Sequence, residues 1–206
     1  MTIHCENPNT ISSEAEAMFN VTNTLGKSLI EKLANSINDL KSHWKGSDAV
    51  VNISDLIGVY TDVTTLVKKL QDLIVSLNNQ SVIPLQKEIV ADGGTCTIGS
   101  ELAKTLGGIE DTIAVPTDSG EVWTDQAIIT DADTFNGFPG TFENFVNELN
   151  GAKDVLLKNW LEGAGRENVV NAFKSFNENV PNYKTKITSV RDNLNTIASN
   201  KKTLLR

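Results

Sequence analysis

The chain has 206 residues, of which 39% are hydrophobic and 21% charged, a composition typical of a folded globular protein with a real core. Its formal net charge is −8 and no basic patch stands out, so nucleic acid is not an expected partner. The N-terminal residues have neither a basic stretch nor an apolar run, and no apolar run reaches the length of a membrane span. A cleaved signal peptide and a membrane partner are therefore not expected.

The first long stretch is predicted to be a helix over residues 13–44. Ser13 and Glu16 have the spacing of a capping box, with Ser13 as the N-cap. Apolar or small residues then recur at steps of three or four and so share one helix face. They are Ala15, Met18, Thr22, Leu25, Leu29, Leu33, Ile37, Leu40 and Trp44. Gly26 is the only residue inside this pattern that disfavours a helix.

A second helix is predicted to follow directly, over residues 47–78. Gly46 is suited to end the first helix, and Ser47 or Asp48 to cap the next. The second helix has an unbroken heptad seam: Ala49, Ile53, Leu56, Tyr60, Val63, Val67, Leu70, Ile74 and Leu77. Such a seam indicates lengthwise packing against other helices. Because the connection is short, the two helices should form an antiparallel hairpin, with regular helix ended before Pro84.

Residues 84–138 differ in kind, because they are rich in glycine and hold ten acidic but only two basic residues. The excess of acid equals the whole net charge of the protein. Short β-prone pieces at 95–98, 112–115 and 122–124, with turn chemistry at 118–120, predict strands and a hairpin. The simplest interpretation is that these acidic residues keep the surface of the protein soluble. The more specific alternative is that they bind a basic partner.

Helical periodicity returns at about residue 141 and leads to a second Trp and Gly break at Trp160 and Gly163. The seam that follows keeps its phase across Pro181, which predicts one kinked helix rather than two. Its residues are Phe173, Phe176, Val180, Tyr183, Ile187, Val190, Leu194 and Ile197. The two halves of the chain therefore form a weak internal repeat.

These patterns predict a mainly α protein, a four-helix bundle built from two long helical hairpins with a small, partly β insert between them. The predicted domains are a first hairpin at 1–83, the acidic insert at 84–138 and a second hairpin at 139–206, which packs on the first. In an antiparallel pairing the insert would have to span the bundle, about 45 Å. Its length permits that arrangement without proving it.

Residues 11–78, with Trp44-Lys45-Gly46 between two long amphipathic helices, resemble the WXG family, the helical-hairpin proteins of type VII secretion. Members of that family dimerise, usually antiparallel, into four-helix bundles and act as secreted effectors, as carriers for larger substrates or as parts of the export machinery. The resemblance implies a non-enzymatic protein that binds protein partners, such as the secretion machinery or a larger substrate. The second half departs from the motif, with Trp160-x-x-Gly163 in place of Trp-x-Gly.

The resemblance also implies secretion without a cleaved signal peptide; otherwise the protein would be cytoplasmic. The family's export signal, a Tyr followed four residues later by an acidic residue, is not found, since Thr64 follows Tyr60 and Ile187 follows Tyr183. Either the signal lies on a partner or the protein is not exported in that way. The chain is interpreted as a monomeric pseudo-dimer that supplies both hairpins, or as a homodimer.

No catalytic, cofactor-binding or metal-binding set emerges from the sequence. With His4 and His43 as the only histidines, and Cys5 and Cys96 far apart, neither a zinc site nor a catalytic triad is expected. The two cysteines are compatible with one disulfide or with two free thiols. Asp131–Phe142 matches a calcium loop poorly, because its fifth, sixth and twelfth positions are wrong.

Three aromatic residues of the insert, Trp123, Phe135 and Phe138, have two interpretations. They pin the insert onto the bundle, or they form an exposed partner-binding patch. Two other functions also stay open for the whole chain: a membrane-active helical toxin component, and a structural coiled-coil protein of a phage or cell surface. Against the toxin, the insert is acidic and lacks a long apolar tongue.

Overall fold

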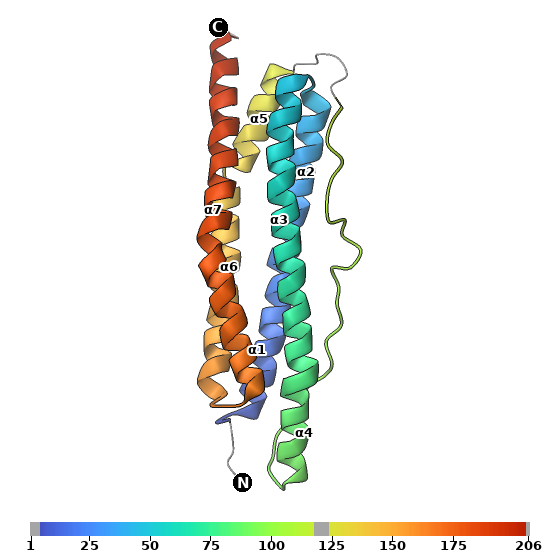
Figure 1. Ribbon diagram of the computed structural model, residues 1–206, viewed down its shortest axis with the longest axis vertical. Coiled ribbons are helices and arrows are strands. Elements are labelled where there is room, and N and C mark those ends of the chain that lie inside the picture. Colours follow the sequence, from blue (N-terminus) through green and yellow to red (C-terminus); the bar gives the residue numbers. More distant parts are fainter. Residues whose placement is uncertain (1–4, 118–123, 205–206) are drawn as a thin grey trace. The chain divides into compact units, whose positions relative to one another are not determined.

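The computed structural model describes residues 5–117 and 124–204, and this part of the chain is mainly α, as predicted (Figure 1). The chain divides into two compact units. Unit 1 comprises Met1–Lys27, Val67–Gly108 and Asn144–Val180, and unit 2 comprises Ser28–Leu66, Ile109–Glu143 and Pro181–Arg206. Both units therefore combine residues from both halves of the sequence.

The first helical stretch consists of α1 (Pro8–Val21), a π-helical turn η1 (Thr22–Gly26) and α2 (Lys27–His43). It begins earlier than predicted, because Asn7 caps it: the Asn7 side chain accepts a hydrogen bond from Thr10 N at 3.2 Å. Pro8 follows at the first helical position, where its missing N–H costs nothing. The predicted Ser13 cap is wrong, since Ser13 lies inside the helix and its hydroxyl donates to Thr10 O.

The second stretch consists of α3 (Ser47–Leu77), a π-helical turn η2 (Asn78–Val82) and α4 (Ile83–Ala91). The predicted start of the second helix at Ser47 is confirmed by α3, and all nine residues of its seam are buried. The prediction that regular helix stops before Pro84 is wrong. The π-helical turn shifts the hydrogen-bond register, so that Pro84 falls in the first turn of α4, where no N–H is needed.

The helical stretch Ser47–Ala91 is also long and apolar enough to cross a membrane by length and composition. The core helix of a protein that never enters a membrane meets the same criterion, and 44% of the apolar window is buried here. Because the whole α3 seam is buried, we assign the apolarity of this stretch to packing.

The insert forms no strand in the residues that the structure describes, 92–117 and 124. The predicted strands at 95–98 and 112–115 are therefore wrong, while the predicted turn at 118–120 and most of the strand at 122–124 lie outside the described residues. In unit 1 the insert runs as an extended segment beside α3 and α4 (Figure 1). A strand needs a neighbouring strand to pair with, and the insert lies against helices.

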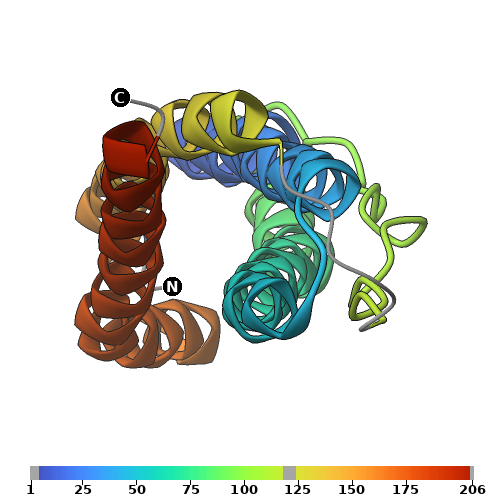
Figure 2. The same ribbon diagram turned by 90° about the horizontal axis from the view of Figure 1, so that it is seen from above.

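The last three helices are α5 (Asp125–Phe135), α6 (Phe138–Asn159) and α7 (Ala164–Leu204). The end of the predicted insert is thus helical, and α6 begins three residues before the predicted start at 141. As predicted, one helix, α7, continues through Pro181. Within unit 2, α5 lies beside the end of α2 (Figure 2), where a hydrogen bond joins Thr124 N to His43 O.

A substitution at Gly26 tests how closely the helices of unit 1 pack. A Cβ atom at Gly26 would lie 2.5 Å from Val67 Cγ1 and 3.3 Å from Phe145 Cε2, whereas a Cβ atom at Gly58, inside α3, would meet nothing within 4 Å. We expect Gly26→Ala to lower the free energy of unfolding by about 1–3 kcal/mol through overpacking. Gly58→Ala should leave it unchanged or raise it by up to about 1 kcal/mol, because alanine favours a helix.

Urea unfolding followed by circular dichroism measures both changes. Equal stability of the Gly26→Ala and Gly58→Ala proteins would contradict the packing described for Gly26.

Candidate functional site

The first Trp–Gly junction, Trp44–Gly46, lies in unit 2 and separates α2 from α3. Trp44 donates its backbone N–H to Leu40 O at 2.8 Å and so completes the last turn of α2. Gly46 has a φ of 108°, in the left-handed region that favours glycine. The Gly46 carbonyl accepts from Val50 N at 3.0 Å, which is the first hydrogen bond of α3. Gly46 therefore both reverses the chain and begins the next helix.

The second junction, Trp160–Gly163, lies in unit 1 and has the same construction. Trp160 N donates to Leu156 O at 3.0 Å, Gly163 has a φ of 119°, and Gly163 O accepts from Glu167 N at 3.1 Å. The extra residue between Trp160 and Gly163 is accommodated in the loop. Arg166 braces this loop, since its Nε donates to Trp160 O.

Both indole rings are buried, with 1% of Trp44 and 3% of Trp160 exposed. In unit 1 a Cβ atom at Gly165 would lie 2.7 Å from the Trp160 ring and 2.8 Å from Ser81 Cβ. The first turn of α7 therefore packs directly on Trp160, and only a residue without a side chain fits there.

Each junction is also contacted by a short segment from the other half of the sequence. This segment directly precedes the first helix of its own half. In unit 1 Glu6, which precedes α1, donates its N–H to Asn159 O at 2.9 Å, and Cys5 forms an isolated antiparallel bridge with Trp160. In unit 2 Thr124, which precedes α5, donates its N–H to His43 O at 3.2 Å. The acceptor in each case is the residue immediately before the tryptophan. We call Cys5–Asn7 and Thr124 the lead segments.

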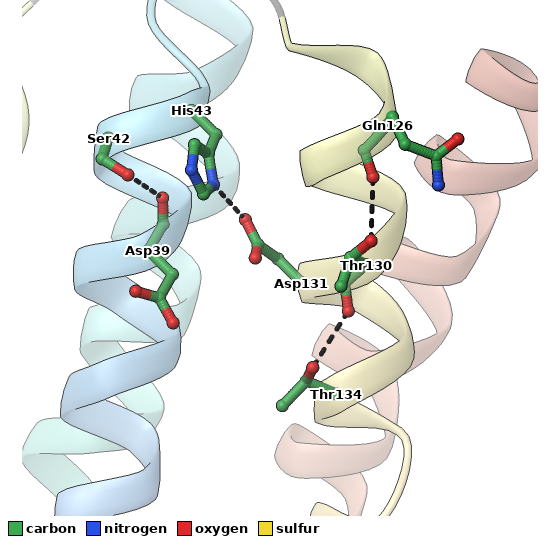
Figure 3. A network of polar contacts seen from close by, with 7 residues as sticks. All are labelled: Asp39, Ser42, His43, Gln126, Thr130, Asp131 and Thr134. Atoms are coloured by element: carbon green, nitrogen blue, oxygen red, sulfur yellow. Dashed lines mark hydrogen bonds and ion pairs between the residues drawn. The ribbon is translucent and has the colours of Figure 1, made fainter.

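A polar contact reinforces the first junction (Figure 3). His43 Nδ1 lies 2.9 Å from Asp131 Oδ2 on α5, and the Asp131 side chain is only 10% exposed. Neighbouring hydroxyls bond within their own helices, as Ser42 does to Asp39 O and Thr134 to Thr130 O (Figure 3). In the part of the chain that the structure describes, no group of three or more His, Cys, Asp or Glu side chains could hold a metal ion.

Phe135 and Phe138 are buried in unit 2, where their rings stack with centroids 5.1 Å apart. The exposure that a surface patch requires is therefore absent at both, and Trp123 lies outside the described residues. The two rings line a pocket of about 360 Å³ together with polar side chains of α2 that include Lys32, Ser36 and Asp39. Stacking of these rings joins the end of α5 to the start of α6.

A row of side-chain amides in unit 1, which the sequence interpretation missed, holds the insert. Gln71 Oε1 accepts from the backbone N–H groups of Thr105 and Leu106 at 2.9 and 3.1 Å. Asn79 bonds both the N–H and the carbonyl of Leu102, at 2.9 and 2.8 Å. Two further residues complete the row: Asn78, which donates to Ser100 O, and Gln86, which accepts from Gly99 N.

The amides of Gln71, Asn78 and Gln86 are almost fully buried. A buried amide without a partner costs about 1–3 kcal/mol, so these positions stabilise the fold only while the insert lies over them. The signal in the sequence is that three polar residues, spaced seven and eight apart, interrupt an apolar helix on one face.

Comparison of the chain with protein families, with curated proteins and with solved structures returns no match. The two junctions, their lead segments and the amide row are therefore interpreted from their geometry and chemistry.

Alanine at the two junction glycines tests the left-handed turns. We expect Gly46→Ala and Gly163→Ala each to destabilise the protein by about 1–3 kcal/mol, because a side chain is strained at a positive φ. Gly151→Ala in α6, where a Cβ atom meets nothing within 4 Å, is the matched control and should be neutral or slightly stabilising. The stabilities of the three variants are compared by their midpoints of urea unfolding. If the two junction variants are as stable as Gly151→Ala, Gly46 and Gly163 are not required for the left-handed turns.

Leucine at Gln71 tests the amide row. Gln71→Leu leaves the N–H groups of Thr105 and Leu106 without their acceptor, so we expect a loss of about 1–3 kcal/mol and faster hydrogen exchange at these two amides. The control is Gln80→Leu, because the exposed Gln80 bonds only to Ser76 on its own helical stretch. Unchanged exchange at residues 105 and 106 in Gln71→Leu would show that the amide row does not hold the insert.

Proposed function

We propose that the chain is a non-enzymatic helical interaction protein of the type VII secretion class, a substrate, carrier or effector that binds protein partners. The observation that carries this proposal is the pair of Trp–Gly junctions, each of which ends one long helix and begins the next around a buried tryptophan. The first junction has the Trp-x-Gly spacing of the WXG family, and the second reaches the same backbone geometry with one more residue.

The proposed architecture is a pair of helical hairpins from one chain, packed antiparallel into a four-helix bundle. In an antiparallel pair, the open end of each hairpin lies beside the closed end of the other. The contacts of Glu6 with Asn159 and of Thr124 with His43 are of this kind, because each joins a lead segment to the junction of the other half. Both halves contribute one such contact, which supports a pseudo-dimer within a single chain.

The insert would then serve as the connection between the two hairpins. It joins the end of α4 to the start of α5, and its extended course along helical side chains suits a segment that must cover distance. Extended chain advances about 3.3 Å per residue, against 1.5 Å in a helix. Exposed acidic residues such as Asp92, Glu101 and Glu110 then keep the surface of the insert soluble.

Export from the cell tests the function directly. A tagged copy of the chain is expressed in a bacterium that carries type VII secretion machinery, and its appearance in the culture medium is followed with the machinery intact and with it deleted. We expect the protein in the medium only when the machinery is intact, and a cytosolic marker protein serves as the control for lysis. Equal amounts in the medium of both strains, or retention in both, would reject membership of this secretion class.

A further inference from the structure

The two cysteines, which lie far apart in the sequence, both lie at the start of α1 in unit 1. Cys5 is buried in the first lead segment, where its backbone pairs with Trp160. Cys96 is half-buried in the insert, and its thiol contacts Gln86 O at 3.5 Å. The structure has both as free thiols.

Hydrogen bonds tie the insert on both sides of Cys96 to the residues that follow Cys5. Gln86, the residue that Cys96 contacts, donates its side-chain N–H to Pro8 O at 2.9 Å. Thr97 N donates to the Asn9 side chain at 2.9 Å. Since a chain spans at most about 3.6 Å per residue, Cys5 cannot lie far from either point.

Cys96 also acts electrostatically on Cys5. Burial raises the pKa of the Cys5 thiol above its ordinary value, and the charge of the neighbouring Cys96 raises this pKa further. Such an effect weakens with distance, so it agrees with the hydrogen bonds in bringing the two side chains together.

We propose that Cys5 and Cys96 are a disulfide-forming pair, which an organic disulfide oxidises to an intramolecular bond that joins the first lead segment to the insert. Neither cysteine lies in a helix, so no helix has to be disrupted to reach the separation that a disulfide requires. This inference does not depend on the proposed function.

The order of the two steps follows from the exposure of the two thiols. The half-buried Cys96 reacts first: its thiolate attacks the organic disulfide, forms a mixed disulfide and releases one thiol. The buried Cys5 then attacks Cys96 Sγ as the thiolate and expels the second thiol. The two cysteines lose two electrons and two protons, and the organic disulfide gains them as it becomes two thiols.

The bond would stabilise the arrangement that the amide row already holds. It closes a loop of about 90 residues, and the entropy that such a link removes from the unfolded chain raises the melting temperature by roughly 5–15 °C. Hydrogen exchange at the insert residues next to Cys96, Thr97 to Leu102, should slow when the bond forms.

The test uses the purified full chain, reduced and then exposed to oxidised glutathione, with the products identified by intact mass and by peptide mapping. Wild type should reach a monomer that has lost both free thiols and carries no glutathione, with Cys5 linked to Cys96. Cys5→Ser should stop at one glutathione on Cys96, and Cys96→Ser should react more slowly than either, because Cys5 is buried.

Wild type that keeps glutathione on Cys96, or that forms disulfide-linked dimers, would overturn the proposal. Because the wild-type product decides the question, the result stands even if a serine variant fails to fold. Oxidised and reduced wild type with the same melting temperature and the same exchange at 97–102 would overturn the claim that the bond secures the insert.

Discussion

Burial of the α3 seam is the constraint on which the rest of the structure depends. Nine apolar residues in heptad spacing along a helix of 31 residues, about 46 Å long, must be covered over their whole length. Each fully buried aliphatic side chain contributes about 1.5–3 kcal/mol relative to exposure, so leaving the seam open would exceed the net stability of a typical domain. In unit 1, η1 and α6 help to cover this seam, since a Cβ atom at Gly26 would meet both Val67 of α3 and Phe145 of α6.

Long helices leave two problems at their ends, and the junctions solve both. The chain must reverse, which Gly46 and Gly163 allow through a positive φ, and the space at the closed end must be filled, which Trp44 and Trp160 accomplish. The carbonyl before each tryptophan still needs a donor, and a lead segment from the other half provides it. One lead segment from each half thus donates to the junction of the other half, which is a reciprocal pairing of backbone groups.

Periodicity predicted the parts of the fold that depend on burial alone. The start of α3, the continuity of α7 through Pro181 and the two breaks at the tryptophans follow from apolar spacing and from glycine placement. The prediction was wrong at helix ends, where more than one local arrangement satisfies the backbone hydrogen bonds. Asn7 and Pro8 start α1 in place of Ser13, and a π-helical turn admits Pro84, a register change that a period of 3.6 residues does not reveal.

The insert shows a different limit of sequence reasoning. Its β-prone residues suggested strands, yet its backbone partners include the side chains of Gln71, Asn79 and Gln86 on the helical stretch that precedes it. The strand propensity of a segment indicates which backbone conformation it favours, but not which hydrogen-bonding groups will lie beside its backbone. For Phe135 and Phe138 the sequence left two interpretations open, a buried anchor or an exposed patch, and in the structure both rings are buried.

The distance between the first lead segment and the second junction is the most direct measurement of the central claim. Spin labels at the exposed positions Glu6 and Leu161, in a chain with Cys5→Ser and Cys96→Ser, report it by pulsed electron resonance. Because Glu6 bonds to the residue before Trp160, the account predicts a single short distance, below about 20 Å with label linkers included. A distance on the order of 40 Å, the length of one long helix, would place the lead segment at the other end of that hairpin and contradict the reciprocal pairing.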